Sequence, residues 1–182
     1  MRREVSEFDQ AVYFKIRKNV IDFLAKQAGQ LDAPGLLLLD VAPQMHAGAR
    51  QSFKMAKVFT ADIDPASGAD FIVDITRNNQ TAVADEVFDV VVCTEVLEHT
   101  LNPFAAVDEI RRLLKPGGLL LATTPFNFRI HGPLPDCWRF TEHGLRALVA
   151  QYEVVSLEAL EDENRFLMPL QYTLVARKPV RP

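Results

Sequence analysis

Cysteine is scarce in this sequence, which has only Cys93 and Cys137 among its 182 residues. These two residues form neither a disulfide scaffold nor a metal-ligand pattern, so we predict no metal site and a reduced, cytoplasmic environment. Long apolar runs are also missing, because no stretch approaches the roughly 20 residues that a membrane-spanning helix needs. The charged start, MRREVSEFDQ, lacks the apolar centre of a signal peptide. We therefore expect no membrane partner.

A surplus of positive charge is absent too, since the formal net charge is −4. A general nucleic-acid binder neutralises phosphates with Lys and Arg, so we expect no nucleic-acid partner. The hydrophobic content of 48% and the charged content of 24% are ordinary for a globular protein. A chain of this length suits one domain with a substantial core. We therefore predict a single domain over residues 1–182, in which an N-terminal helix within residues 1–30 packs on a sheet.

The stretch Phe88–Thr124 carries the clearest structural pattern. Phe88–Cys93 is an apolar, β-branched run with the length of a strand that is buried on both faces. Asn102-Pro103 can cap and begin a helix, and apolar residues then recur at helical spacing. We expect Pro116-Gly117-Gly118 to stop this helix before a second buried strand, Leu119–Thr123. A strand–helix–strand unit of this length predicts two neighbouring parallel strands.

The remaining elements frame this unit. A helix is predicted from Ser6, which can cap it, to Ala28, with Gly29 as its end. Further strands are predicted at Leu36–Val41, Val58–Ala61, Phe71–Val73, Val154–Ala159 and Tyr172–Arg177. Only about a dozen residues separate the last two strands, too few for a helical crossover, so this pair should be antiparallel. The predicted fold class is α/β: a Rossmann-like, doubly wound sheet of about seven strands, mostly parallel, with one antiparallel strand near the C-terminal edge.

Acidic residues close three of the predicted strands. Asp40 ends the first strand and Asp62 ends the second about 20 residues later, a spacing at which nucleoside-binding sheets place a ribose-binding carboxylate. A carboxylate can accept hydrogen bonds from both vicinal hydroxyls of a ribose. The alternative for Asp62 is a turn residue in Asp-Ile-Asp-Pro, and Asp64 competes for the ribose role although the proline after it favours a turn. Asp74, which closes the third strand, would either meet an adenine amino group or form an Asx turn.

The segments DVAPQ, TADIDP, GADFIVDIT, FDVVVCTEVLEH and EIRRLLKPGGLLLATTP follow one another in an order that resembles the class I S-adenosylmethionine-dependent methyltransferases. The chain is most similar to their type 11 group, and the similarity covers roughly Leu36 to Thr141. The resemblance implies a methyltransferase whose cofactor is S-adenosylmethionine. It also implies cofactor-binding roles for residues at the strand ends, namely Asp40, Val41, Ala42, Pro43, Gln44, Asp62, Ile63, Asp74, Ile75, Thr94, Glu95 and His99.

The turn after the first strand departs from the family pattern. Most members have two or three glycines here, which allow positive φ and a close approach of the backbone to the cofactor. This chain has Ala42-Pro43-Gln44-Met45-His46, with no glycine before Gly48, and Pro43 has no N–H to donate. Either Gln44 and backbone groups replace the lost contacts, as the family's similar Ala-Pro members suggest, or the affinity for the cofactor is reduced.

Methyl transfer needs a base only when the acceptor is a hydroxyl or a protonated amine. The candidates are His131 and Asp136, which lie in a proline-rich loop, and Glu95, with His99 behind it. The alternatives are that His99 is a hydrogen-bonded turn residue and that Asp136 starts a turn. The Trp138-Arg139 pair either faces the substrate or fixes the loop, with the tryptophan on the core and the arginine paired with an acid.

Three functions remain open at this point. The first is methyl transfer to an O or N acceptor on a small molecule, and a resemblance to envelope-sugar members suggests a glycan or its precursor. The substrate pocket would be built from the N-terminal helix and the loop Phe126–Phe140, or completed by a second subunit in a homodimer. The second is a non-catalytic relative that binds the cofactor or a partner protein, which the glycine-poor turn supports and the retained Asp62 and Glu95 oppose. The third, a nicotinamide-dependent oxidoreductase, is disfavoured because no G-x-G-x-x-G follows the first strand.

Overall fold

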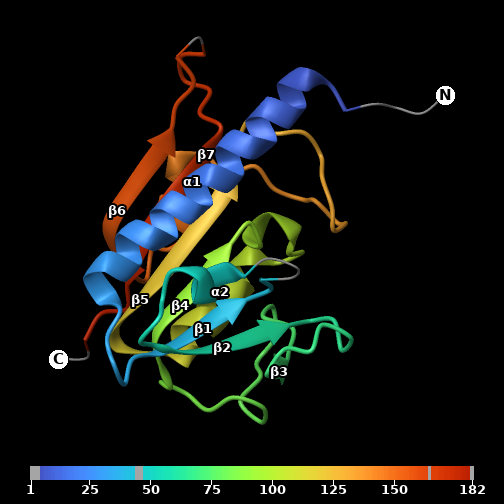
Figure 1. The fold of residues 1–182 in the computed structure, drawn as a ribbon. Coiled ribbons are helices and arrows are strands. Elements are labelled where there is room, and N and C mark those ends of the chain that lie inside the picture. The colour runs from blue at the N-terminus through green and yellow to red at the C-terminus, as the bar shows by residue number, and fades with distance from the viewer. Residues whose placement is uncertain (1–4, 44–46, 164, 181–182) are drawn as a thin grey trace.

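The computed structural model describes residues 5–43, 47–163 and 165–180, so Gln44 of the first turn lies outside the described residues. The described residues form a seven-stranded sheet with helices on both faces (Figure 1). The strands are β1 Leu37–Val41, β2 Lys57–Asp62, β3 Phe71–Ile72, β4 Phe88–Thr94, β5 Leu114–Pro125, β6 Glu153–Leu160 and β7 Gln171–Arg177. The helices are α1 Glu7–Leu31, α2 Pro103–Leu113 and α3 Glu142–Leu148, with short 3-10 helices η1 Gly48–Gln51 and η2 Leu97–His99.

The strands lie in the order β3-β2-β1-β4-β5-β7-β6. Strands β1 to β5 pair in parallel, whereas β7 is antiparallel to both of its neighbours, β5 and β6. The predicted fold class is therefore confirmed, including the single reversed strand near the C-terminal edge. Because the strand order reverses between β1 and β4, the carboxyl ends of these two strands flank the position at which such sheets bind ligands.

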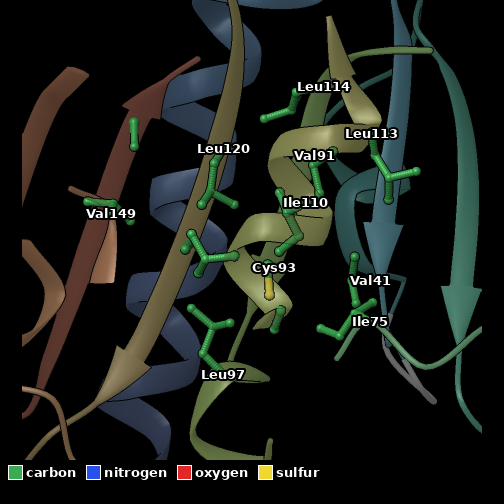
Figure 2. Close-up of a cluster of buried hydrophobic side chains, with 14 of the residues drawn as sticks. Val41, Ile75, Val91, Cys93, Leu97, Ile110, Leu113, Leu114, Leu120 and Val149 are labelled. Carbon is green, nitrogen blue, oxygen red and sulfur yellow. The ribbon is translucent and has the colours of Figure 1, made fainter. Parts of the chain in front are cut away.

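Alternate residues of the central strands build two separate cores. In β4, Val91 and Cys93 join the core under α2 and α3, while Val90 and Val92 join the core under α1. Figure 2 shows the first of these cores, where Ile110 of α2 lies against Val91 and Cys93. Side chains alternate across a strand, so a strand covered on both faces needs a continuous apolar run. Burial of each large aliphatic side chain contributes about 1.5–3 kcal/mol, which fixes the sheet between its helices.

The N-terminal helix is longer than its sequence predicts. Ser6 caps α1 by accepting the Asp9 N–H at 3.1 Å, as expected. The helix continues through Gly29 to Leu31, so the prediction that Gly29 ends it was wrong. The chain leaves the helix at Asp32, whose carboxylate instead accepts backbone N–H groups of residues 54–56. No helix in the described part of the chain combines the length and the apolar character that a membrane span requires.

The central unit has the predicted elements, with a different junction. Asn102 caps α2 by accepting the Ala105 N–H, and α2 ends at Leu113. Strand β5 begins at once, at Leu114, rather than after the predicted stop at Pro116-Gly117-Gly118. These three residues form an irregularity inside the strand, where the pairing with β4 shifts register. Gly117 has φ of 82°, which allows the chain to bend there without strain.

Candidate functional site

Two cavities adjoin at the carboxyl ends of β1, β2 and β4. The larger, of about 540 Å³, is bounded by α1, the turn after β1, the end of β4 and the loop after β5. The smaller, of about 240 Å³, lies between the turn after β1 and the end of β2, where Asp62 lines it. Pro43 and Ala47 line both cavities. The turn after β1 therefore forms a common wall between two binding spaces.

This turn obtains its shape from two residues with positive φ, Ala42 at 51° and Gly48 at 55°. Ala42 adopts a conformation that normally favours glycine, and its N–H donates to the Ala61 carbonyl at 2.7 Å. A Cβ on Gly48 would collide with the Asp40 carboxylate, so the glycine is sterically required at this position. Asp40 is almost fully buried and accepts the Ala49 N–H at 2.7 Å, which joins β1 to the start of η1.

Burial raises the pKa of Asp40 to about 6, although its hydrogen bond from Ala49 opposes the shift. The Asp40 carboxylate therefore binds the Ala49 N–H inside the protein, and it lines neither cavity. This is a departure from the family resemblance, which groups Asp40 with the residues beside the cofactor. The residue holds the turn in place from inside.

Asp62 has the geometry of its turn alternative, and it also lines a cavity, so its ribose-binding role stays a prediction. Its Oδ1 accepts the Asp64 N–H at 2.9 Å, which makes it a turn residue, and the side chain also lines the smaller cavity. Asp74 instead matches its turn alternative: its Oδ1 accepts the N–H and hydroxyl of Thr76, and Oδ2 pairs with Arg77 at 3.1 Å. Its neighbour Ile75 is buried in the core under α2. Of the three acids that close strands, Asp62 is the one that lines a cavity.

The predicted site residues fall into three groups. Those that line a cavity are Ala42, Pro43, Asp62, Thr94, Glu95, His99 and His131. Those that the cavity linings do not include are Asp40, Val41, Ile63, Asp74, Ile75 and Asp136. Gln44 lies outside the described residues. Asp40, Val41 and Ile63 lie at or beside a strand end, where neighbouring side chains point to opposite sides of the sheet.

Glu95 lies where β4 ends, with φ of 54°, and faces the larger cavity. Its Oε1 accepts hydrogen bonds from Thr123 Oγ1 at 2.9 Å and Gln171 Nε2 at 2.7 Å. Gln171 in turn accepts from Asn19 Nδ2 at 2.7 Å, so α1, β7, β5 and β4 are joined through one network. Burial, together with the charge of Glu98, raises the pKa of Glu95 to about 8. Glu95 is therefore mostly protonated at pH 7, and the carboxylate form that can accept a proton increases as the pH rises toward 8.

His99 and His131 lie next to each other in the lining of the larger cavity. Their rings form an edge-to-face pair with centroids 4.8 Å apart. Nδ1 of His99 lies 2.9 Å from the Pro135 carbonyl, which confirms the hydrogen-bonded turn alternative while the residue also lines the cavity. Nδ1 of His131 lies 3.1 Å from Asp136 Oδ2, and the His131 backbone N–H donates to the same oxygen at 2.9 Å. Burial lowers the pKa of His99.

Asp136 and the residues after it hold the loop that forms this wall. Hydrogen bonds from Arg139 keep the pKa of Asp136 well below its usual range. Arg139 also donates to the carbonyls of Phe128 and Arg129. Trp138 stacks on Phe140 and donates its indole N–H to the Thr100 carbonyl at 2.8 Å. Trp138 and Arg139 therefore fix the loop, as in the second alternative, but Trp138 is 40% exposed and does not lie in the core.

Glu98 is a buried acid that sequence analysis did not single out. Its side chain has no exposed surface, and neither carboxylate oxygen has a hydrogen-bond partner within the described residues. Burial raises the pKa of Glu98 to about 8. Its backbone carbonyl accepts N–H groups of Cys137 and Trp138, so the loop after β5 covers it. The acid lies in Leu-Glu-His, but only the folded loop makes it buried.

Sequence analysis placed the N-terminal helix and the loop Phe126–Phe140 at the pocket, and both line the larger cavity, but it named no residue of α1 and missed the contribution of β7. Tyr13, Phe14 and Arg17 of α1 line the larger cavity, and Gln171 of β7 holds Glu95. In Figure 1 the loop after β5 lies beside the N-terminal half of α1, where Arg129 pairs with Asp9 at 3.7 Å. Patterns within one element do not reveal such contacts, because the partners are far apart along the chain.

Short segments of this chain are similar to proteins named ubiquinone biosynthesis O-methyltransferase. The ubiquinone biosynthesis O-methyltransferase of Haemophilus ducreyi is 44% identical over 52 residues, which cover 29% of this chain and 22% of that protein. The protein of the same name from Cereibacter sphaeroides (strain ATCC 17029) is 51% identical over 49 residues, covering 27% and 20%. The chain thus matches about a fifth of the length of these relatives.

Solved structures share the fold. The [4+2]-cyclase SpnF has a TM-score of 0.66 at 19% identity, over 90% of this chain and 81% of its own. Phosphoethanolamine N-methyltransferase 2 of Haemonchus contortus, solved in complex with S-adenosyl-L-methionine, has a TM-score of 0.67 at 16% identity, over 89% and 52%. A family model described as a methyltransferase domain matches residues 23–122, more than half of the chain. This protein therefore belongs to the S-adenosylmethionine-dependent methyltransferase domain family.

Proposed function

We propose that this protein transfers the methyl group of S-adenosylmethionine to an oxygen or nitrogen atom of a small acceptor. The observation that carries the proposal is the pair of adjoining cavities. Asp62 lines the smaller one, and Glu95 and His131 line the larger one. A nucleoside-binding carboxylate thus lies on one side of the first turn, and groups that can accept a proton lie on the other. The local matches to proteins named O-methyltransferases support an oxygen acceptor first.

The residues present fit the cofactor. Within the described residues, hydrogen bonds engage only Oδ1 of Asp62, so Oδ2 is free to accept from a ribose hydroxyl. Ala42 and Gly48 both have positive φ, the backbone conformation that glycines provide in this turn in most relatives. Asp62 would hold the ribose, and the turn with Thr94 would hold the methionyl part. When bound, the cofactor supplies a methyl group that its sulfonium has already activated.

The acceptor would enter between α1 and the loop after β5. Tyr13 and Phe14 of α1 and Phe128 of the loop give the larger cavity aromatic walls. Such walls favour an acceptor with an apolar or aromatic body, oriented by a few polar groups. The glycan acceptor suggested by sequence stays a prediction, to be compared with phenolic and amine acceptors in the same assay.

A hydroxyl acceptor must lose its proton during the transfer. As its oxygen forms a bond to the methyl carbon, the carbon–sulfur bond breaks and leaves its electron pair on sulfur, which yields S-adenosylhomocysteine. We assign the proton to Glu95, because this carboxylate lines the cavity and is oriented by Thr123 and Gln171. Asp136 is a positioning residue in this scheme, because its oxygens are bound to Arg139 and His131.

Calorimetric titration with S-adenosylmethionine and S-adenosylhomocysteine tests the cofactor half of the proposal. We expect micromolar affinity for wild type and a loss of about 10- to 150-fold in Asp62→Ala, the range for a lost charge-assisted hydrogen bond. Asp64→Ala is the matched control, because among the described residues the side chain of this neighbouring exposed acid accepts only the N–H of Ala66. Absence of binding by wild type at millimolar ligand would overturn the proposal.

An assay of turnover tests the second part of the proposal, the transfer of the methyl group to an acceptor. Transfer of a labelled methyl group to a phenolic, amine or sugar acceptor is expected for wild type, with kcat at least about tenfold lower in Glu95→Gln. Tight binding of S-adenosylhomocysteine without transfer to any acceptor class would favour the non-catalytic relative, which the glycine-poor first turn also suits.

A further inference from the structure

The strongest unexplained feature is the buried carboxylate of Glu98. Its two oxygens have no hydrogen-bond partner within the described residues, and its side chain is fully buried. The nearby charge of Arg139 favours the ionised form but makes no hydrogen bond to it. A carboxylate removed from water without hydrogen bonds is costly, so buried carboxylates are normally hydrogen-bonded or coordinate a cation. The methyl-transfer scheme does not use this residue. Within the described residues, the Glu98 carboxylate therefore lacks the hydrogen-bonding or cationic ligand that its burial calls for.

Two imidazole nitrogens lie next to this carboxylate. Nε2 of His99 and Nε2 of His131 are each 3.7 Å from Glu98 Oε1. One ligand atom from each of the three residues lies within 4.8 Å of the others. Around a tetrahedral ion with bonds of about 2.1 Å, ligand atoms are about 3.4 Å apart, so modest rotations of the two rings would complete the geometry.

The far side of each ring is arranged as it is in metal-binding histidines. Nδ1 of His99 lies 2.9 Å from the Pro135 carbonyl, and Nδ1 of His131 lies 3.1 Å from the Asp136 carboxylate. Both partners are acceptors, so they hold the proton on Nδ1 and direct the lone pair of Nε2 toward Glu98. A carbonyl or carboxylate behind a ligating imidazole fixes its tautomer and raises its basicity.

We propose that Glu98, His99 and His131 form a binding site for a divalent cation of the zinc class. Two imidazole nitrogens and one carboxylate oxygen are a donor set that suits Zn²⁺ and related first-row ions better than Mg²⁺ or Ca²⁺. Three protein ligands leave a coordination position open, and His99 and His131 both line the larger cavity. The cation would hold an acceptor oxygen there and lower its pKa, a role that rests on the proposed methyl transfer. The binding site itself does not.

Titration of the untagged, chelator-stripped full chain with Zn²⁺ tests the site. We expect one Zn²⁺ per chain at pH 7.5, and binding at least about tenfold weaker in both His131→Ala and Glu98→Gln. His143→Ala is the matched control, because this exposed histidine lies on α3, and it should bind Zn²⁺ like wild type. Co²⁺ gives a second readout, since an absorption band of a tetrahedral site should appear in wild type and not in His131→Ala.

Equal Zn²⁺ affinity in wild type, His131→Ala and Glu98→Gln would overturn the proposal, as would no binding by wild type at about 100 µM Zn²⁺. Because Glu98→Gln changes a buried group, its melting curve is recorded first, and His131→Ala alone decides the outcome if that variant fails to fold. S-adenosylhomocysteine is titrated into the same samples. Loss of Zn²⁺ binding with retained S-adenosylhomocysteine binding separates the metal site from the cofactor site.

Discussion

The Asp136 carboxylate accepts two N–H groups of Arg139, at 2.5 Å from Nη1 to Oδ1 and 2.7 Å from Nη2 to Oδ2. This two-point contact sits inside the loop that forms one wall of the larger cavity, and Arg139 also donates to backbone carbonyls of that loop. Since His131 donates its own N–H to Asp136, the pair determines where the cavity-facing imidazole lies. Side-chain hydrogen bonds therefore fix the conformation of this loop, although it contains neither helix nor strand.

Arg139→Lys should lower the free energy of unfolding by about 1–3 kcal/mol, because lysine cannot reproduce the two-point contact with Asp136 or the bonds to the carbonyls. Urea denaturation measures the change. Arg146→Lys is the control, since Arg146 pairs with Glu142 on an exposed face of α3, and it should change stability by less than about 0.5 kcal/mol. Equal effects of the two substitutions would contradict the structural role of Arg139.

Gly48→Ala should destabilise the protein by about 1–3 kcal/mol, because the added methyl group meets the Asp40 carboxylate and φ is positive. Gly29→Ala provides a control of the opposite sign. Gly29 lies within α1 with open space around it, so alanine should stabilise the helix by about 0.5–1 kcal/mol. Thermal melting of the two variants compares them directly, and stabilisation by Gly48→Ala would exclude the turn geometry described above.

Asp40→Asn should change the pH dependence of stability. The pKa of Asp40 is raised to about 6 in the folded protein, so the folded state binds this proton more tightly than the unfolded state does. Stability contributed by the protonated form is present at pH 4 and is lost as pH rises through 6. The asparagine variant avoids that loss and keeps an acceptor for Ala49, so relative to wild type it should gain up to about 3 kcal/mol between pH 4 and pH 7.5. A difference that stays constant between these pH values, measured by urea denaturation, would count against a buried Asp40.

The two thiols should react very differently. Cys93 is fully buried in the core under α2, and burial raises the pKa of its thiol, whereas Cys137 is exposed. A colorimetric thiol reagent should therefore modify one cysteine per native chain and two per chain in urea. Cys137→Ser should remove the native reaction, and rapid modification of Cys93 in that variant would contradict the packing shown in Figure 2.

The elements predicted most accurately are those whose signal lies within a short stretch. The apolar run Phe88–Cys93 and the Asn102 cap predict β4 and α2 because burial on both faces and capping are local requirements. Gly29 shows the limit of such reasoning, since a glycine ends a helix only where the chain takes positive φ, and here Asp32 determines the end. The α/β class follows from the order of elements and was accessible from sequence.

The site was accessible only in part. Asp62, Glu95 and His131 lie at strand ends or in the long loop, where the sheet topology makes cavity positions predictable. Glu98 was not accessible, because its burial depends on Cys137 and Trp138 folding over it. Sequence analysis predicted no metal site, from the cysteines alone. The cation site proposed above would join Glu98 and His99 of η2 to His131 of the loop after β5, and such a set gives no comparable spacing signal.

Helix α1 forms one wall of the larger cavity through Tyr13, Phe14, Arg17 and Ile21, all of which precede the matched family segment at residues 23–122. Under the proposed function, these α1 residues would contact the acceptor from outside the matched segment, whereas Asp62 and Thr94, which would hold the cofactor, lie within it. Substitutions on one exposed stripe of a single helix could redirect such a protein to a new acceptor while its cofactor site and sheet stay unchanged. Evolution could therefore change the acceptor by substituting the exposed residues of α1 that line the larger cavity.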